Sequence, residues 1–232
     1  MKWWMASVLL VLAACRPDAT RAEKPELYLL TSLPLLFEEG FGLKPAKGEA
    51  ATFLRDHYRL KPIDLPSQLP AGGVLLAAQP RALPAEELVA LDKWVRDGGK
   101  LLLLADPMLE WSSTRPVGDR LRPPVSFADT GLLLHWGLRL DAPDKRGLKA
   151  TRSGDIELTH ASPGRLVKTG GTCRLEAQDS FAECRVGKGR VIILADADWL
   201  DVEAIKVAGG HPVNHIFALV LLFESLGAKA KL

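Results

Sequence analysis

Three aspartates follow two strongly apolar runs of this 232-residue sequence. Asp106 comes directly after residues 101–105, and Asp196 and Asp198 follow residues 190–195. Runs that are apolar on both faces are typical of central strands in a parallel sheet, and ligands bind beyond the carboxyl ends of such strands. We therefore expect the three carboxylates to meet at one rim of a sheet. There they could bind a metal or do acid–base chemistry, or they could simply cap the loops that follow the strands.

Two further segments bring polar residues to the same rim. One follows the apolar run at residues 27–30. The other is the start of an apolar helix predicted over residues 213–226. A helix that follows a strand in this type of fold runs back antiparallel to it, so its first residues should lie at the rim where the strands end. The ligand-binding candidates at the rim are Thr31, Ser32, Asp106, Asp196, Asp198, His211 and Asn214.

The sequence contains none of the common catalytic or nucleotide-binding motifs. It has no G-x-S-x-G nucleophile elbow, no Walker loop and no dinucleotide-binding glycine pattern. The formal net charge is +2, from 30 basic and 28 acidic residues, without the basic stripe that nucleic-acid binding requires. We therefore assign no catalytic residue, no metal ligand and no cofactor, and we expect no nucleic-acid partner.

The N-terminus is typical of an exported lipoprotein. Residues 1–14 contain one lysine and an apolar run that is too short to span a bilayer but has the length of a signal-peptide core. The end of this segment, LAAC, resembles the lipobox of bacterial lipoproteins, so we expect lipidation at Cys15 and a polar tether over residues 15–25. A plain cleaved signal peptide is the alternative. The expected location is the cell envelope, facing the periplasm. If the host has two membranes, we expect the outer one, because Cys15 is followed by Arg16 and not by an aspartate, the residue usually linked with retention in the inner membrane.

The two remaining cysteines are expected to form a disulfide. Cys173 and Cys184 lie in short segments that resemble neighbouring strands, CRLEAQ and AECRVG. In an oxidising compartment such a pair most simply joins a hairpin, and closing a loop of this size stabilises a fold by roughly 2–3 kcal/mol. A metal site would call for further Cys or His ligands close by in the sequence.

The pattern of elements predicts an α/β fold with a mostly parallel central sheet. Residues 84–107 show the repeating unit, in which Pro84 opens a helix with an apolar stripe, Gly98 ends it, and a buried strand follows. We expect one domain over residues 26–227 and a tail after it. Residues 142–185 have alternating polar patterns, which predict an antiparallel β extension of the same sheet.

A family resemblance rests on three consecutive pieces of sequence. They are LVALDKWVRDGGKLLLLADP at residues 88–107, GKGRVIILADADWL at residues 187–200, and the Asn-led apolar helix. Together they resemble the periplasmic domain of gliding-motility-type ABC-transport auxiliary proteins and related uncharacterised domains with a type 1 glutamine amidotransferase-like fold. The resemblance implies a flavodoxin-like sandwich without catalytic activity. This sequence lacks the nucleophilic cysteine that true amidotransferases carry after a central strand, so glutamine hydrolysis is not expected.

Two functions are compatible with these features. The first is a lipid-anchored, non-catalytic envelope module that binds a partner protein or a small ligand at the strand-end rim, as an auxiliary to an ABC-type transport system. Its partner would be an envelope protein such as an ABC-type permease. The alternative is a metal-dependent hydrolase acting on an envelope carbohydrate or peptide, with the aspartates and His211 as ligands or as an acid–base pair.

Overall fold

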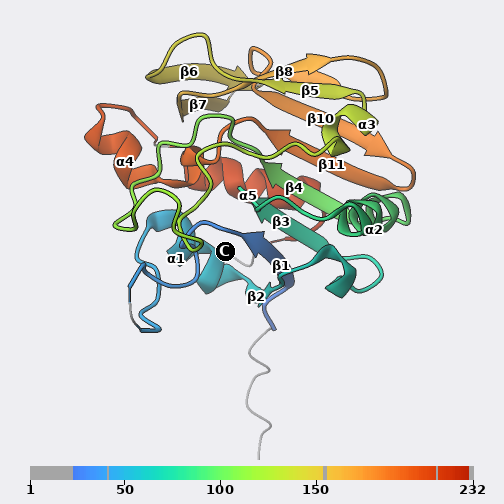
Figure 1. The fold of residues 1–232 in the computed structure, drawn as a ribbon, viewed down its shortest axis with the longest axis horizontal. Helices are drawn as coiled ribbons and strands as arrows, with labels where there is room; N and C mark the ends of the chain where they lie inside the picture. Colours follow the sequence, from blue (N-terminus) through green and yellow to red (C-terminus); the bar gives the residue numbers. More distant parts are fainter. Residues whose placement is uncertain (1–22, 41, 154–155, 213, 230–232) are drawn as a thin grey trace, which may run out of the picture.

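The apolar runs of the sequence form a central sheet of seven strands, in the order β2-β1-β3-β4-β11-β10-β9 (Figure 1). The five strands from β2 to β11 are parallel, and β10 and β9 continue the sheet in antiparallel orientation. The predicted fold class is therefore confirmed. The strands are β1 (Glu26–Thr31), β2 (Arg59–Pro62), β3 (Val74–Ala78), β4 (Lys100–Leu104), β9 (Arg174–Glu176), β10 (Phe181–Val186) and β11 (Gly189–Leu194).

The computed structural model describes residues 23–40, 42–153, 156–212 and 214–229. The predicted signal peptide and Cys15 lie outside these residues, as does most of the tether. In the described part of the chain, no helix combines the length and the apolarity needed to cross a membrane. The long apolar helix α5 (His215–Ser225) has 11 residues.

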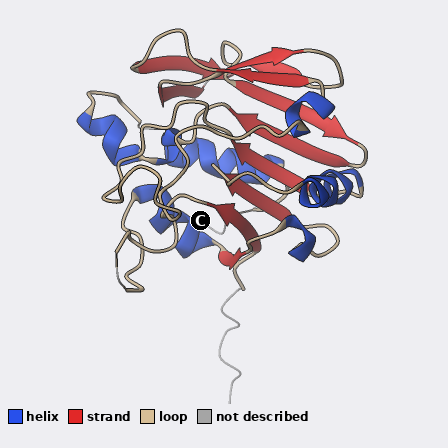
Figure 2. Ribbon diagram, viewed as in Figure 1, coloured by secondary structure: helices blue, strands red, loops and turns tan. Residues whose placement is uncertain are grey.

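Helices cover both faces of the sheet (Figure 2). The other α-helices are α1 (Glu49–His57), α2 (Ala85–Arg96), α3 (Leu132–His135) and α4 (Val202–Val207). On one face, Phe53 of α1 and Phe223 of α5 join the core formed by one set of alternate strand side chains. On the other face, Leu91 of α2 and Leu133 of α3 pack on the opposite set. Because β3 and β4 are covered on both sides, their residues are apolar, apart from Lys100 at the start of β4.

The unit formed by α2 and β4 follows the sequence pattern closely. Pro84 is the N-cap residue of α2, and Glu86 lies in the first turn, near the positive end of the helix dipole. Gly98, with φ of +118°, takes the left-handed conformation that ends the helix, and Gly99 donates its N–H to the Trp94 carbonyl at 3.0 Å. The chain then enters β4 at Lys100.

The β-rich region differs in part from the prediction. β9 and β10 extend the main sheet as expected, but the other strands form two separate two-stranded sheets. These sheets are β5 (Leu138–Asp141) with β8 (Arg165–Lys168), and β6 (Leu148–Ser153) with β7 (Ile156–Ala161). Alternating polarity shows that one strand face is buried, but it does not identify the strand that pairs with it.

The predicted disulfide is present. Cys173 and Cys184 are bonded, with their Cα atoms 4.1 Å apart. The bond joins the residue before β9 to a residue of β10, and both cysteines are buried. It therefore fastens the antiparallel edge of the sheet.

Candidate functional site

The register of the parallel strands brings their carboxyl ends to one level. Ala78 of β3 and Leu194 of β11 are both paired with Leu104 of β4. Thr31, at the end of β1, is paired with Ala78. The loops that leave these four strands consequently start from one rim, where the sequence predicts the candidate site.

Asp106 joins the loop after β4 to the loop after β11. Its side chain is fully buried, and Oδ1 accepts a hydrogen bond from the Met108 N–H at 2.7 Å. Oδ2 accepts from the Ala197 N–H at 2.9 Å and from the Asp198 N–H at 3.4 Å. These backbone donors support the loop-capping interpretation of this aspartate.

Asp196 lies in a buried chain of hydrogen bonds with His160 and Thr151. Its Oδ2 accepts from Nδ1 of His160 at 2.9 Å, and Nε2 of His160 lies 2.9 Å from the Thr151 hydroxyl. Because a carboxylate only accepts, Nδ1 of His160 donates to Asp196, and in the neutral imidazole Nε2 then accepts from the Thr151 hydroxyl. A hydroxyl–imidazole–carboxylate chain has the order of groups found in a hydrolase triad. Thr151 is only 2% exposed and the other two groups are fully buried, so substrate cannot reach the hydroxyl in this conformation.

Asp198 extends the hydrogen-bonded cluster toward the loop after β4. Its Oδ2 accepts from the Glu110 N–H at 2.6 Å. Glu110 in turn accepts from the Ser162 hydroxyl at 2.9 Å, at the end of β7. The loop after β4, the loop after β11 and the β6–β7 hairpin are therefore held together by one connected set of side chains.

The three aspartates offer carboxylate oxygens that all lie within 4.8 Å of one another. Burial, together with the neighbouring Asp196 charge, raises the pKa of Asp106 to about 7. Burial and the Asp106 charge raise the pKa of Asp198 to about 9. Like charges at this separation in a low-dielectric site cannot all persist, so the cluster retains protons at neutral pH.

Gln79 fixes the neighbouring strand end. It is fully buried, and its φ of +44° is uncommon for a residue other than glycine. Its side-chain amide accepts from the Asp106 N–H at 2.9 Å and donates to the Asp106 carbonyl at 3.0 Å and the Pro124 carbonyl at 3.1 Å. The backbone around Asp106 is thus held from both β3 and β11.

The other predicted rim residues have different roles. The Thr31 and Ser32 hydroxyls donate to backbone carbonyls at the end of β3 and immediately after it, at 2.7 and 2.5 Å. His211 is exposed, and Asn214 is the N-cap residue of α5 without a side-chain cap bond. His215 is buried and donates from Nδ1 to the Trp199 carbonyl at 3.2 Å. Burial lowers the pKa of His215 to about 4.

Sequence reasoning missed His160, Gln79 and Glu110. Of these, His160 carried a signal, because it follows Leu158 at the two-residue spacing that defines one face of a strand. A histidine in the buried set of an alternating strand needs a polar partner. Its partner, Asp196, is 36 residues away in the sequence, and pairing at this separation leaves no local pattern.

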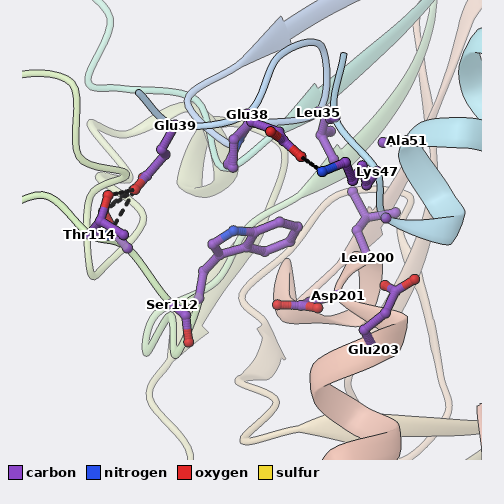
Figure 3. Close-up of a pocket in the computed structure, with 15 residues that line it drawn as sticks. Leu35, Glu38, Glu39, Lys47, Ala51, Ser112, Thr114, Leu200, Asp201 and Glu203 are labelled. Atoms are coloured by element: carbon purple, nitrogen blue, oxygen red, sulfur yellow. Dashed lines mark hydrogen bonds and ion pairs between the residues drawn. The ribbon is translucent and has the colours of Figure 1, made fainter. Parts of the chain in front are cut away.

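A cavity of about 550 Å³ opens at the same rim (Figure 3). Its walls are the loop after β1, the start of α1, the loop after β4, and the segment from η2 (Asp198–Leu200) into α4. Half-buried Trp111 and buried Leu35 and Leu200 supply apolar surface. The volume lies within the usual range for small-molecule sites.

Two contacts fix the walls of this rim cavity. Glu39 accepts hydrogen bonds from the hydroxyls of Ser113 and Thr114 and from the Thr114 N–H, which joins the loop after β1 to the loop after β4. Lys47 forms an ion pair with Glu38 at 2.8 Å within the loop after β1. Figure 3 shows these two contacts along one side of the cavity.

Comparison with solved structures shows the fold alone. An exo-beta-1,4-mannosidase from Opitutaceae bacterium strain TAV5 superposes with a TM-score of 0.50 at 13% identity, over 90% of this chain and 36% of that one. A catalytic mutant of a GH42 beta-galactosidase from G. stearothermophilus gives 0.53 at 12% identity, over 90% and 31%. A cytoplasmic protein of Salmonella typhimurium LT2 gives 0.49 at 10% identity, over 87% and 99%. This chain spans only about a third of the length of the two glycosidases.

Comparison with curated protein sequences finds no significant match. A family model described as a domain of unknown function, DUF4350, matches residues 48–206. The matched segment runs from the start of α1 into α4, and it includes His160 and the three aspartates. Because the match covers more than half of the chain, this protein belongs to the DUF4350 family.

Proposed function

We propose that this protein is a lipid-anchored, non-catalytic module of the cell envelope that binds a small ligand or a partner protein at the strand-end rim. The observation that carries this proposal is the rim cavity of about 550 Å³, which is lined by loops from three strand ends. The buried side chains of Gln79 and Asp106 hold two of these loops, those after β4 and β11, at the strand ends. A cavity with preformed walls binds ligand at a lower cost in conformational entropy.

The hydrogen bonding of the aspartates favours a structural role over catalysis. Asp106 and Asp196 accept backbone N–H groups on both carboxylate oxygens. All three aspartates are at most 3% exposed. Groups that are buried and already bonded in this way hold the rim in place instead of meeting a substrate.

Two features of the sequence support the proposed lipid anchor and the proposed partner. The segment that ends at Cys15 supports a lipid anchor facing the periplasm. The resemblance to gliding-motility-type auxiliary proteins supports an envelope protein, such as an ABC-type permease, as the partner. In this arrangement the rim cavity presents its ligand, or the loops around it, to the transport machinery.

Site-specific crosslinking in cells tests binding at the rim. A photoreactive p-benzoylphenylalanine replaces Ser112, an exposed residue that lines the cavity. The control carries the same group in place of Phe217, which is 55% exposed on α5 and does not line the cavity. We expect an envelope protein to be captured from position 112 and not from position 217. Capture should fall when Trp111→Leu is added, because this change alters the cavity wall.

Two results would contradict the proposal. One is equal capture from both positions. The other is capture from position 112 that Trp111→Leu leaves unchanged. Circular dichroism and thermal melting of each variant would show that a lost crosslink does not result from unfolding.

A metal-dependent hydrolase of an envelope carbohydrate or peptide is the second candidate. It is favoured by the three carboxylates within 4.8 Å and by a cavity of about 230 Å³ that Asp198 and Glu110 help to line. Metal analysis of the purified protein and of Asp198→Asn decides between the two functions. Stoichiometric metal in the wild type that is lost from the variant would support the hydrolase. Protein without metal that still captures its partner would support the binding module.

A further inference from the structure

The rim cavity is unevenly charged. Four carboxylates line it, those of Glu38, Glu39, Asp201 and Glu203, against the single ammonium of Lys47, which gives the lining a formal charge of −3. A partly enclosed site with one sign of charge concentrates ligands of the opposite sign. The charge of the cavity therefore selects against anions.

The carboxylates on the two sides of the cavity differ in how far they are neutralised. Glu38 is paired with Lys47, and Glu39 is occupied by three donors from Ser113 and Thr114. On the opposite side, Asp201 and Glu203 project from the start of α4 (Figure 3). Among the residues that the structure describes, no cation forms an ion pair with either of these two groups.

Each of these two carboxylates uses one oxygen for a backbone contact. Oδ1 of Asp201 accepts from the Ala204 N–H at 3.0 Å, and Oε1 of Glu203 accepts from the Glu49 N–H at 2.9 Å. The nearby ammonium of Lys206 is paired with the Glu49 side chain. Burial and the Glu203 charge raise the pKa of Asp201, as expected for a carboxylate without a counterion.

Trp111 gives an aromatic surface to the cavity that these carboxylates also line. It is half-buried and packs against the hydrophobic core, which restricts its side chain. Cations bind favourably over the face of an indole, and quaternary ammonium ligands are recognised in this way. The hydroxyls of Ser113 and Thr114 already donate to Glu39, so neither is free to donate to a neutral polyol.

We propose that the ligand of the rim cavity is a small organic cation, whose charged group lies against Trp111 and is balanced by Asp201 and Glu203. This inference rests on the proposed binding function, and it names the chemical class of the ligand.

Calorimetric titration of the purified full chain with choline tests the proposal. The matched control ligand is 3,3-dimethylbutan-1-ol, which has the same shape with carbon in place of the charged nitrogen. We expect choline to bind about tenfold or more tightly than the alcohol, since only choline gains the cation–π and ion-pair interactions. Equal affinity for the two compounds, or no binding of choline, would overturn the proposal.

Two variants locate the choline site. Asp201→Asn keeps an oxygen that can cap α4 but removes the charge, and Trp111→Leu keeps apolar volume but removes the aromatic face. Each should weaken choline binding by a factor of roughly 3 to 30. The controls Glu86→Gln and Phe217→Leu remove an exposed carboxylate and an exposed ring away from the cavity, and they should leave affinity unchanged. Unchanged affinity in Asp201→Asn and Trp111→Leu would place choline elsewhere and overturn the proposal.

The crosslinking experiment separates this inference from the function on which it rests. Suppose choline does not bind, but capture from position 112 is still lost in Trp111→Leu. The organic cation is then wrong and the binding module stands. If choline does not bind and position 112 captures no partner, both proposals fail.

Discussion

The rim depends on acidic side chains that lie close together inside the protein. Asp106, Asp196 and Asp198 are buried, and one carboxylate oxygen from each lies within 4.8 Å of the other two. Most of these oxygens accept backbone N–H groups, which stabilises negative charge, whereas burial and mutual repulsion oppose it. Negative charge is stabilised more at Asp106 than at Asp198. Asp106 accepts backbone N–H groups on both carboxylate oxygens, whereas Asp198 accepts a single N–H group, that of Glu110.

The protein should lose stability as pH rises from about 4 to about 9. The pKa values of Asp106 and Asp198 in the folded protein, about 7 and about 9, lie above the ordinary value near 4 of the unfolded chain. Between these values the folded protein holds more protons, so the free energy of unfolding falls with pH, by at most about 1.4 kcal/mol per unit for each carboxyl. Urea unfolding across this pH range measures the slope. A flat profile would contradict the prediction.

Asp198→Asn should reduce this slope and raise stability at pH 8 by roughly 1–3 kcal/mol. The amide is neutral at every pH, and its oxygen can still accept from the Glu110 N–H. Urea unfolding at pH 5 and pH 8 measures the change. Asp97→Asn, at a carboxyl whose side chain is 65% exposed, is the control and should follow the wild type. A variant less stable than wild type at pH 8 would show that Asp198 is needed as a carboxylate.

His160→Leu should destabilise the fold by about 2–4 kcal/mol, because it leaves Asp196 and the Thr151 hydroxyl buried without their shared partner. His211→Leu is the matched control. That histidine is exposed, and its removal should change stability by less than about 0.5 kcal/mol. Thermal and chemical unfolding at pH 7.5 distinguish the two. Similar effects at both positions would contradict the role assigned to His160.

At the scale of elements, side-chain contacts, strand pairing and the disulfide all join the β-rich region to the sheet. The β6–β7 hairpin is attached through His160 and Ser162, which bond to the loops after β11 and β4. β9 is held at the sheet edge by pairing with β10 and by the disulfide. Short strands need such fastenings, because two-stranded sheets are only marginally stable alone.

Removing the disulfide with Cys173→Ala and Cys184→Ala should lower the free energy of unfolding by about 2–3 kcal/mol. The bond closes a short loop, with a sequence separation of 11, and restricts the unfolded chain. Guanidinium unfolding measures the loss. Cys15→Ala should leave the unfolding curve of the domain unchanged. A loss below about 1 kcal/mol in the double variant would show that the β9–β10 edge holds without the bond.

At the scale of the whole molecule, the structure is a sheet with helices on both faces (Figure 1). The rim cavity lies among the loops at the strand ends. The proposed lipid at Cys15 would be joined to β1, which begins at Glu26, by a tether of 10 residues. A fully extended tether of this length reaches at most about 36 Å. This tether would join β1 at its amino end, so the rim at the carboxyl ends of the strands lies on the opposite edge of the sheet from the attachment point.

Cys15→Ser should move the protein from the membrane fraction to the soluble periplasmic fraction, because it removes the only proposed acyl acceptor. Cell fractionation with metabolic labelling by a fatty acid measures both location and lipidation. Cys173→Ser with Cys184→Ser is the control and should remain lipidated. In a host with two membranes, the wild type should fractionate with the outer membrane. Membrane association that persists in Cys15→Ser would contradict the lipid anchor.

Local sequence patterns determined the main elements of the fold. The helix from Ala85 and the strands at Val74–Ala78 and Lys100–Leu104 follow from helix-capping residues, a glycine stop, and runs apolar on both faces. The strand-like segments around Cys173 and Cys184, together with the expected export to an oxidising compartment, were enough to predict the disulfide. Parallel strands also end at a shared rim, so the grouping of Asp106 with Asp196 could be predicted before the contacts were known.

Only the tertiary structure decided how the rim is built. His160 meets Asp196 across 36 residues, and Gln79 clamps the Asp106 backbone across 27. The rim cavity likewise depends on loops whose contacts, such as Glu39 with Ser113, span 74 residues. Secondary structure arises from interactions between near neighbours, which leave a period in the sequence. Side chains brought together by folding of distant loops leave no such period, and their pairing is set by the shape of the whole fold.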